Sequence, residues 1–162
     1  MMVLKNQDMN KKYIAEINLA KMKAPLDSPI LKEFVDFLEP INKLADESLG
    51  FVWRLKDDEG NSFASTASQL EDDMILVNMS VWKDLEALKS YTYDTAHSYF
   101  VRAGRKWFKR MKSPHVALWW VDHDQIPTVE EALSKIKLIE KHGPTSEAFN
   151  FKQVYNSMGE EI

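Results

Sequence analysis

The chain has 162 residues, 44% of them hydrophobic and 28% charged, a balance typical of one globular domain with its own core. It contains no cysteine, which excludes disulfides, a thiolate nucleophile and cysteine-ligated metal centres. The formal net charge of −4 argues against a nucleic-acid partner, and no apolar run approaches the length of a membrane span. Because the N-terminus lacks the apolar stretch of a secretory signal, we expect a cytoplasmic protein.

The first strand is expected shortly after the N-terminus. Residues 5–8 and 10–12 are polar and offer nothing to bury, which predicts a flexible leader over 1–11. Residues 13–20 alternate between two sides, which predicts a strand with Glu16 and Asn18 on the same side. Exposure at a sheet edge explains Glu16, whereas Asn18 is harder to explain in this way because apolar residues flank it.

A helix and a second strand follow. Ser28 is a suitable N-cap before a proline at the first helical position, and the apolar spacing predicts a helix over 29–47. Pro40 lies inside this range and should kink or split the helix. Residues 51–55 predict the second strand.

The second half predicts two apolar strands around a long helical region. The strands are expected at 74–82 and 115–121, and the helical region at 84–111 with a break near Gly104. The polar loop before the first of these strands leaves room for a short additional strand at 62–66, which is not counted among the main strands. A capping box that begins at Thr128 then opens a C-terminal helix, which stops at Gly143.

This order predicts an α+β fold of the ferredoxin-like β-α-β-β-α-β type, with a four-stranded antiparallel sheet, helices on one face and an extra C-terminal helix. We place the domain at 12–151 and a tail at 152–162. The strands at 74–82 and 115–121 are apolar on both faces, although helices on one face leave the other bare. A second copy of the sheet is the simplest cover, so we expect a homodimer.

His97 is the strongest candidate for chemistry. It lies one helical turn after Tyr93 in the predicted helix, on an apolar and aromatic stripe that continues to Trp107 and Met111. Its imidazole is either packed in the core, or it points into a cavity between helix and sheet as a base or an axial haem ligand.

A basic segment, 102–112, resembles a nucleic-acid patch, but cations are also favoured at a helix C-terminus, and we expect a solvated helix face. Within it, Arg105 is a candidate for binding a ligand carboxylate. Adjacent residues in a loop rarely converge on one ion, so we expect no metal site at 122–124.

Several segments together resemble a known family. They are Asn18, Phe51–Leu55, Asn78–Trp82, Ala96–His97 through Trp107–Phe108, Pro114–Trp120 and Pro127–Ala132. The chain resembles an uncharacterised bacterial family of domains of unknown function in the dimeric α+β barrel superfamily. The resemblance implies that two ferredoxin-like sheets pair into one barrel. The superfamily includes cofactor-free monooxygenases of the antibiotic-biosynthesis type and haem-degrading monooxygenases.

The haem-degrading branch carries an Asn on the first strand, a Trp on the long helix and a later His that binds haem. Asn18 and His97 occupy matching places in this chain. The helical Trp is missing, since Tyr91 or Tyr93 stands near its place, and this departure argues against haem degradation. We therefore expect no cofactor, with haem as the less favoured alternative.

The leading hypothesis is one small-molecule pocket per subunit between sheet and helices. Its expected lining is Asn18, Trp53, Tyr93, His97 and Trp107. Tyr93 and His97 would position or deprotonate an aromatic or polyketide-like substrate in a monooxygenase-type reaction. The alternatives are a ligand-binding protein without turnover, and a purely structural dimer in which these side chains are packed. We expect no membrane partner.

Overall fold

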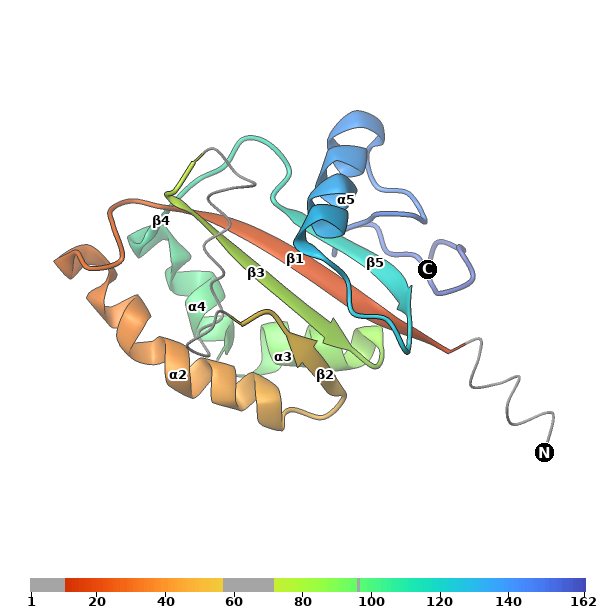
Figure 1. The fold of residues 1–162 in the computed structure, drawn as a ribbon, viewed down its shortest axis with the longest axis horizontal. Helices are drawn as coiled ribbons and strands as arrows, with labels where there is room; N and C mark the ends of the chain where they lie inside the picture. Colours follow the sequence, from red (N-terminus) through yellow and green to blue (C-terminus); the bar gives the residue numbers. More distant parts are fainter. Residues whose placement is uncertain (1–10, 57–71, 96) are drawn as a thin grey trace.

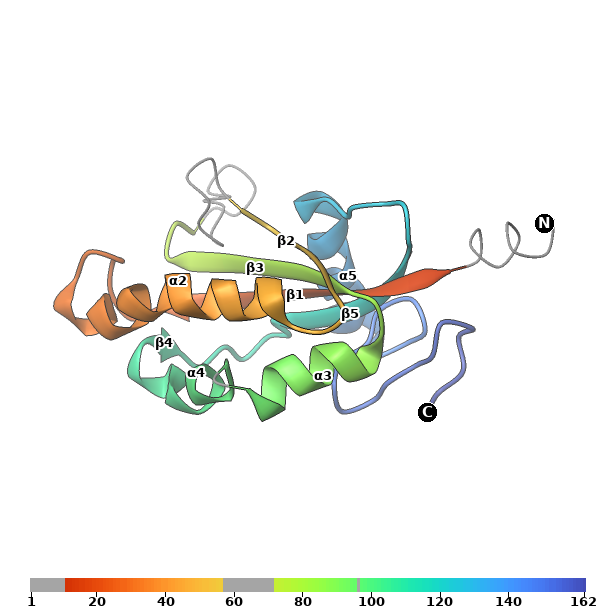
Figure 2. The same ribbon diagram turned by 90° about the horizontal axis from the view of Figure 1, so that it is seen from below.

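The computed structural model describes residues 11–56, 72–95 and 97–162, with only the backbone at His97 and Phe100. An antiparallel sheet runs through the middle of the molecule, with α3 and α4 on one side and α5 on the other (Figures 1 and 2). The strands are β1 (Lys12–Met22), β2 (Phe51–Arg54), β3 (Ile75–Trp82), β4 (Phe108–Lys109) and β5 (Val116–Asp122). The helices are η1 (Pro29–Leu31), α2 (Lys32–Glu47), α3 (Leu85–Asp94), α4 (His97–Ala103), η2 (Gly104–Lys106) and α5 (Val129–His142). No helix within the described ranges is both long and apolar enough to span a membrane.

The sheet is built around β1, which pairs antiparallel with β3 on one side and with β5 on the other. The predicted α+β class with an antiparallel sheet is confirmed. The predicted number of four strands is wrong, because the short β4 adds a fifth by pairing with Lys21 and Met22. β5 pairs with β1 only as far as Asn18, and this leaves the end of the longer β1 open to β4. The strand predicted at 62–66 lies outside the described residues.

Helix α2 runs through Pro40 as one continuous helix, so the expected split there is wrong. Pro40 is exposed. The carbonyl group of Asp36, which loses its helical N–H donor at the proline, is therefore on the side where water can replace that donor.

The prediction of one long helical region over 84–111 is wrong, because the region is divided into shorter helices. α3 ends at Asp94, and Thr95 has extended backbone angles (φ −111°, ψ −178°) before α4 begins. The hydroxyl groups of Thr92 and Thr95 donate to the carbonyl oxygens of Leu88 and Tyr91, at 2.9 and 2.6 Å. Such side-chain bonds compete with the backbone ladder near a helix end. The predicted stripe from Tyr93 to Met111 is therefore broken into separate elements, while the break at Gly104 is confirmed by the start of η2.

The two faces of the sheet carry different helices. The α5 face, formed on β1 by Ala15, Ile17 and Leu19, packs against Ala132 and Ile136 of α5. The opposite α3 face, formed by the alternate residues of β1, packs against α2, α3 and α4. The expectation of helices on one face only is therefore wrong. The bare sheet face from which we argued for a dimer is occupied by α5, and the dimer stays a prediction.

α5 begins and ends where the sequence predicts. Thr128 is the N-cap, and its hydroxyl oxygen accepts a hydrogen bond from the backbone N–H of Glu131 at 3.1 Å. Gly143 follows the helix with φ +71°, a left-handed conformation that glycine adopts without a steric penalty.

The chain after α5 returns to the α3 face. Phe149 forms a bridge with Leu118 of β5, and both side chains are completely buried. The indole N–H of Trp120 donates to the carbonyl oxygen of Tyr155 at 2.9 Å. Residues 152–162, which we predicted as a tail, thus include Tyr155 and the buried Val154.

Candidate functional site

Polar side chains form two rows across the centre of the α3 face. In the first row, Arg54 of β2 lies opposite Ser80 of β3, which lies opposite Glu16 of β1. In the second row, two residues further along the strands, Asn18 lies opposite Asn78. Residues two apart on a strand point to the same face and are roughly 7 Å apart. We call these five residues the polar cluster.

Aromatic side chains border the polar cluster. The ring of Trp82 stacks on Tyr91 of α3 with centroids 4.9 Å apart, and Phe51 meets its edge at 5.5 Å. Leu118 of β5 lies opposite Glu16 and is completely buried. Apolar side chains therefore border the cluster, and this raises the free-energy cost of ionising the groups in it.

Glu16 has the most perturbed acid–base chemistry of the cluster. Burial raises the pKa of its carboxyl group from 4.5 to about 7, although a hydrogen bond with the Ser80 side chain acts in the opposite direction. A carboxyl group with this pKa is close to half protonated at neutral pH, so it can both accept and donate a proton.

The charge of Glu16 acts on two tyrosines of α3. The pKa of Tyr91 is raised, mainly by burial and further by the negative charge of Glu16, and its hydroxyl donates to the carbonyl oxygen of Ile41 at 3.4 Å. Burial and then Glu16 also raise the pKa of Tyr93, although 52% of this residue is exposed. Phe151 meets the ring of Tyr93 edge-on, with centroids 5.5 Å apart. Both tyrosines therefore stay neutral phenols at physiological pH.

An ion pair between a nearly buried arginine and a more exposed aspartate ends the first row. The Nε atom of Arg54 lies 2.8 Å from Oδ1 of Asp46 on α2, and the guanidinium side chain is only 11% exposed. Its positive charge acts on Tyr91 against the effect of Glu16, by lowering the pKa of the phenol. The pair gives the cluster a fixed dipole between β2 and α2.

Solvent reaches the second row. Asn78 is exposed, and Asn18 and Glu16 are half-buried, although all three lie on the inner, α3 face of the sheet. The helices therefore leave this part of the sheet accessible. Chemically, the cluster offers a carboxyl group that exchanges protons at neutral pH, and two amides that can donate and accept hydrogen bonds.

Of the predicted site residues, Asn18 belongs to this cluster, and Tyr93 on α3 is near enough for the charge of Glu16 to raise its pKa. Trp53 lies on the opposite, α5 face, where it is opposite Val81, so it cannot line one pocket with Asn18 in the same chain. Trp107 is 1% exposed and packs with Phe34 in the core. It is a packing residue in this structure.

The other two predicted residues, His97 and Arg105, lie after the end of α3. Arg105 is exposed in η2, and its carbonyl oxygen accepts a hydrogen bond from the ammonium group of Lys23. His97 is the first residue of α4, and its side chain lies outside the described atoms. Its assignment as a base or haem ligand stays a prediction.

The interpretation of Glu16 as a residue exposed at a sheet edge is wrong. Glu16 lies in the middle of the central strand, between Ser80 and Leu118. The signal available in the sequence was the presence of polar residues at 16 and 18 and again at 78 and 80. Only the pairing register shows that they meet.

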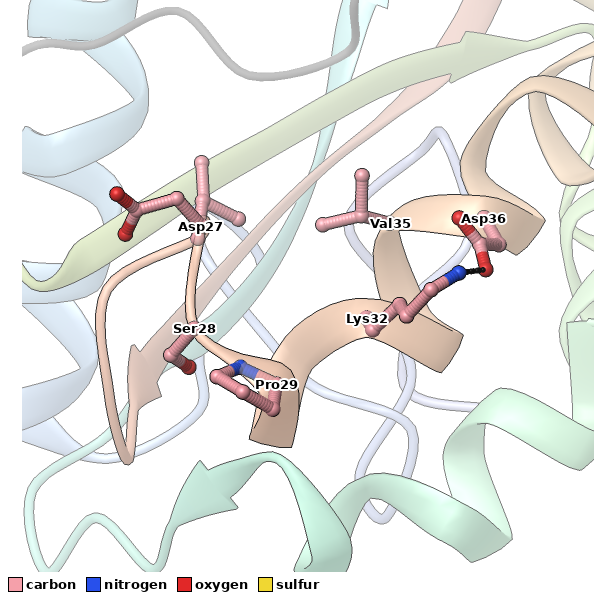
Figure 3. Close-up of a pocket in the computed structure, with 7 residues that line it drawn as sticks. Asp27, Ser28, Pro29, Lys32, Val35 and Asp36 are labelled. Atoms are coloured by element: carbon pink, nitrogen blue, oxygen red, sulfur yellow. Dashed lines mark hydrogen bonds and ion pairs between the residues drawn. The ribbon is translucent and has the colours of Figure 1, made fainter.

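Two other features of the described residues carry no site. No cluster of three or more metal-binding side chains occurs in the part of the chain that the structure describes. A hollow of about 360 Å³ lies where α2 begins, lined by residues that include Ser28, Lys32, Val35 and Asp36 (Figure 3). Lys32 and Asp36 there are paired with each other at 2.7 Å, and the hollow contains none of the predicted site residues.

Comparison with known proteins gives a family but no activity. The family described as Domain of unknown function (DUF3291) matches residues 13–162, which confirms the predicted resemblance to an uncharacterised family. No curated protein matches the chain. A solved protein of unknown function from Nitrosomonas europaea is similar at 10% identity and a TM-score of 0.48, over 74% of this chain and 98% of that chain. A candidate antibiotic biosynthesis monooxygenase from the same organism is similar at 11% identity and a TM-score of 0.45, over 73% and 95%. Similarities of this size decide nothing about the activity of the chain.

Proposed function

We propose a function from the polar cluster itself, because the chain belongs to the DUF3291 family, whose domain has no known function. The chain binds a small hydroxylated aromatic molecule between the sheet and α3, and Glu16 acts as the general base. The observation that carries the proposal is the Glu16 carboxyl group, which has a pKa of about 7 and lies beside a solvent-accessible part of the inner sheet face.

The surroundings of Glu16 suit an aromatic ligand. Trp82 and Leu118 are completely buried and make the surroundings of the carboxyl group apolar, and Tyr91, which stacks on Trp82, is partly exposed and can contact a ligand. The amides of Asn18 and Asn78 lie roughly 7 Å further along the strands, where they can hydrogen-bond a second polar group of the same ligand. Tyr93 borders the cluster from α3 and would position the ligand.

The reaction that we propose is a monooxygenation with molecular oxygen as co-reactant, which is the chemistry that the family resemblance implies. Glu16 removes the phenolic proton, which makes the ring a better electron donor to oxygen. A ring C–H bond and the O–O bond break, and a C–O bond forms. One oxygen atom becomes the new quinone oxygen, and the other leaves as water with the two hydrogens lost by the phenol. A neutral carboxyl group can return the proton that Glu16 removed.

The order of the strands and helices also supports this proposal. We infer a ferredoxin-like arrangement, because the four longer strands lie in the order β2-β3-β1-β5 with α2 and the α3–α4 pair in the two crossover connections. We propose that two such chains associate as in the dimeric α+β barrel superfamily. α5 covers part of the α5 face, so the contact would include the remaining part near β2 and β3.

Oxygen consumption tests the proposal directly. Purified protein is incubated with a panel of hydroxylated naphthalenes and anthracenes in an oxygen electrode, and products are identified by mass spectrometry. We expect uptake of one O₂ per quinone formed, and a loss of at least about 100-fold in Glu16→Gln, as is typical when a general base is removed. Glu39→Gln, which changes an exposed glutamate of α2, is the matched control and should keep full activity. Saturable binding without uptake would replace this proposal by the ligand-binding alternative.

A further inference from the structure

Ser80 holds a hydrogen bond that restricts its hydroxyl group. The indole Nε1 of Trp82 lies 2.9 Å from the Ser80 oxygen, and both residues belong to the α3 face of β3. An indole N–H can only donate, so Ser80 is the acceptor in this bond. Trp82 is completely buried, which fixes the position of the donor.

The hydroxyl proton of Ser80 therefore has to go to another acceptor. Ser80 is 9% exposed, which leaves little access to water. Its register partner on β1 is Glu16, whose side chain points to the same face, and the Ser80 hydroxyl acts on that carboxyl group as a hydrogen-bond donor that lowers its pKa. An ionised carboxylate is the stronger acceptor, so the bond is strongest when Glu16 has lost its proton.

We propose that Trp82 and Ser80 form a relay that positions Glu16: the indole orients the serine hydroxyl, and the hydroxyl holds one carboxyl oxygen of Glu16. Ser80 and Trp82 are positioning residues, since they act through Glu16. The consequence for catalysis rests on the proposed function, whereas the relay itself is a property of the folded chain.

Among the residues that the structure describes, the other titratable and charged groups that act on this region come from three elements. The charge of Glu16 acts on Tyr91 and Tyr93 of α3, and the Arg54–Asp46 pair of β2 and α2 acts on Tyr91. Within the same described residues, Ser80 alone is linked both to Glu16 and to the indole, so the effect of its removal on the indole is specific to the relay.

Nuclear magnetic resonance of the indole N–H groups tests the relay without any substrate. In ¹⁵N-labelled protein, the Nε1 resonance of Trp82 should move with pH at the same midpoint as the carboxyl carbon of Glu16. In Ser80→Ala the indole should no longer follow this titration, and the pKa of Glu16 should rise by about one. Ser80→Thr, which keeps the hydroxyl group, should restore both effects.

The matched control is the indole of Trp120, which donates to the backbone carbonyl of Tyr155 and has no serine between it and Glu16. Its resonance should move less than half as far as that of Trp82. The relay is refuted if the Trp82 indole does not titrate with Glu16, or if it still does in Ser80→Ala. Trp82→Phe serves to assign the resonance, and the serine variants decide the question if that variant fails to fold. An intact relay in a protein that consumes no oxygen would refute the proposed reaction and leave this inference standing.

Discussion

Replacing Glu16 by glutamine should change the pH dependence of stability in a defined way. Glutamine has nearly the same shape, but it cannot ionise. In the native chain the Glu16 pKa is raised from 4.5 to about 7, so between these values the folded state binds more protons than the unfolded state. Stability contributed by the protonated carboxyl group is therefore complete below about pH 4.5, and it is lost as the pH rises through 7.

The size of the effect follows from the same pKa. A difference of about 2.5 between the folded value of about 7 and the ordinary 4.5 corresponds to at most about 3 kcal/mol. Since Glu16 is half-buried, we expect about 2 kcal/mol. Glu16→Gln should thus be more stable than the parent chain by about 2 kcal/mol at pH 8 and nearly equal to it at pH 4.5.

Urea unfolding followed by tryptophan fluorescence at several pH values between 4.5 and 8 measures this difference. Protein concentration and ionic strength must stay constant, because association would add its own contribution. Glu39→Gln controls for the loss of an exposed carboxyl group and should parallel the parent chain at every pH. If Glu16→Gln also parallels the parent chain, the carboxyl group titrates normally and the assignment of Glu16 as a base is refuted.

Four further predictions concern other parts of the molecule. Gly50→Ala should destabilise the fold by at least about 2 kcal/mol in urea unfolding, because Gly50 has φ +83° and a Cβ atom there would lie 2.5 Å from Cβ of Ala87; an unchanged midpoint would contradict this. Light scattering at micromolar concentration should give the mass of a dimer with an interface of roughly 2,000 Å² or more, and a stable monomer would refute it. Hemin titration should leave the free-hemin spectrum unchanged, whereas a stoichiometric Soret band lost in His97→Ala would restore the haem hypothesis. Salt-sensitive micromolar binding to DNA is not expected from a net charge of −4, and fluorescence anisotropy would detect it.

Local signals predicted the elements well where one residue decides the local structure. The hydroxyl of Thr128 caps α5 and Gly143 follows its end, and both effects act within a few residues of the chain. The alternation along β1 likewise assigned Glu16 and Asn18 to one face. The sequence did not predict the break at Thr95, because the helical periodicity continues across it. The hydroxyls of Thr92 and Thr95 donate to backbone carbonyl oxygens there.

The candidate site could be predicted only in part, because it depends on how the strands pair. Asn18 was identified from its own strand, whereas the contact between Glu16 and Ser80 joins residues 64 positions apart through the register of β1 and β3. The face on which Trp53 lies also depends on strand pairing and could not be predicted from its own strand. The pairing of β2 with β3 shifts between Phe51 and Trp53, which places the first on the α3 face and the second on the α5 face. Regular alternation would have given both residues the same face.

Measuring the pKa of the Glu16 carboxyl group tests its proposed role as a general base most directly. The chain is labelled with ¹³C at the glutamate carboxyl groups, and the Glu16 resonance is assigned by its disappearance in Glu16→Gln. Its chemical shift is then followed from pH 3 to pH 9. We expect a midpoint near pH 7, since burial of this carboxyl group disfavours the carboxylate. A midpoint near the ordinary value of 4.5 would contradict it.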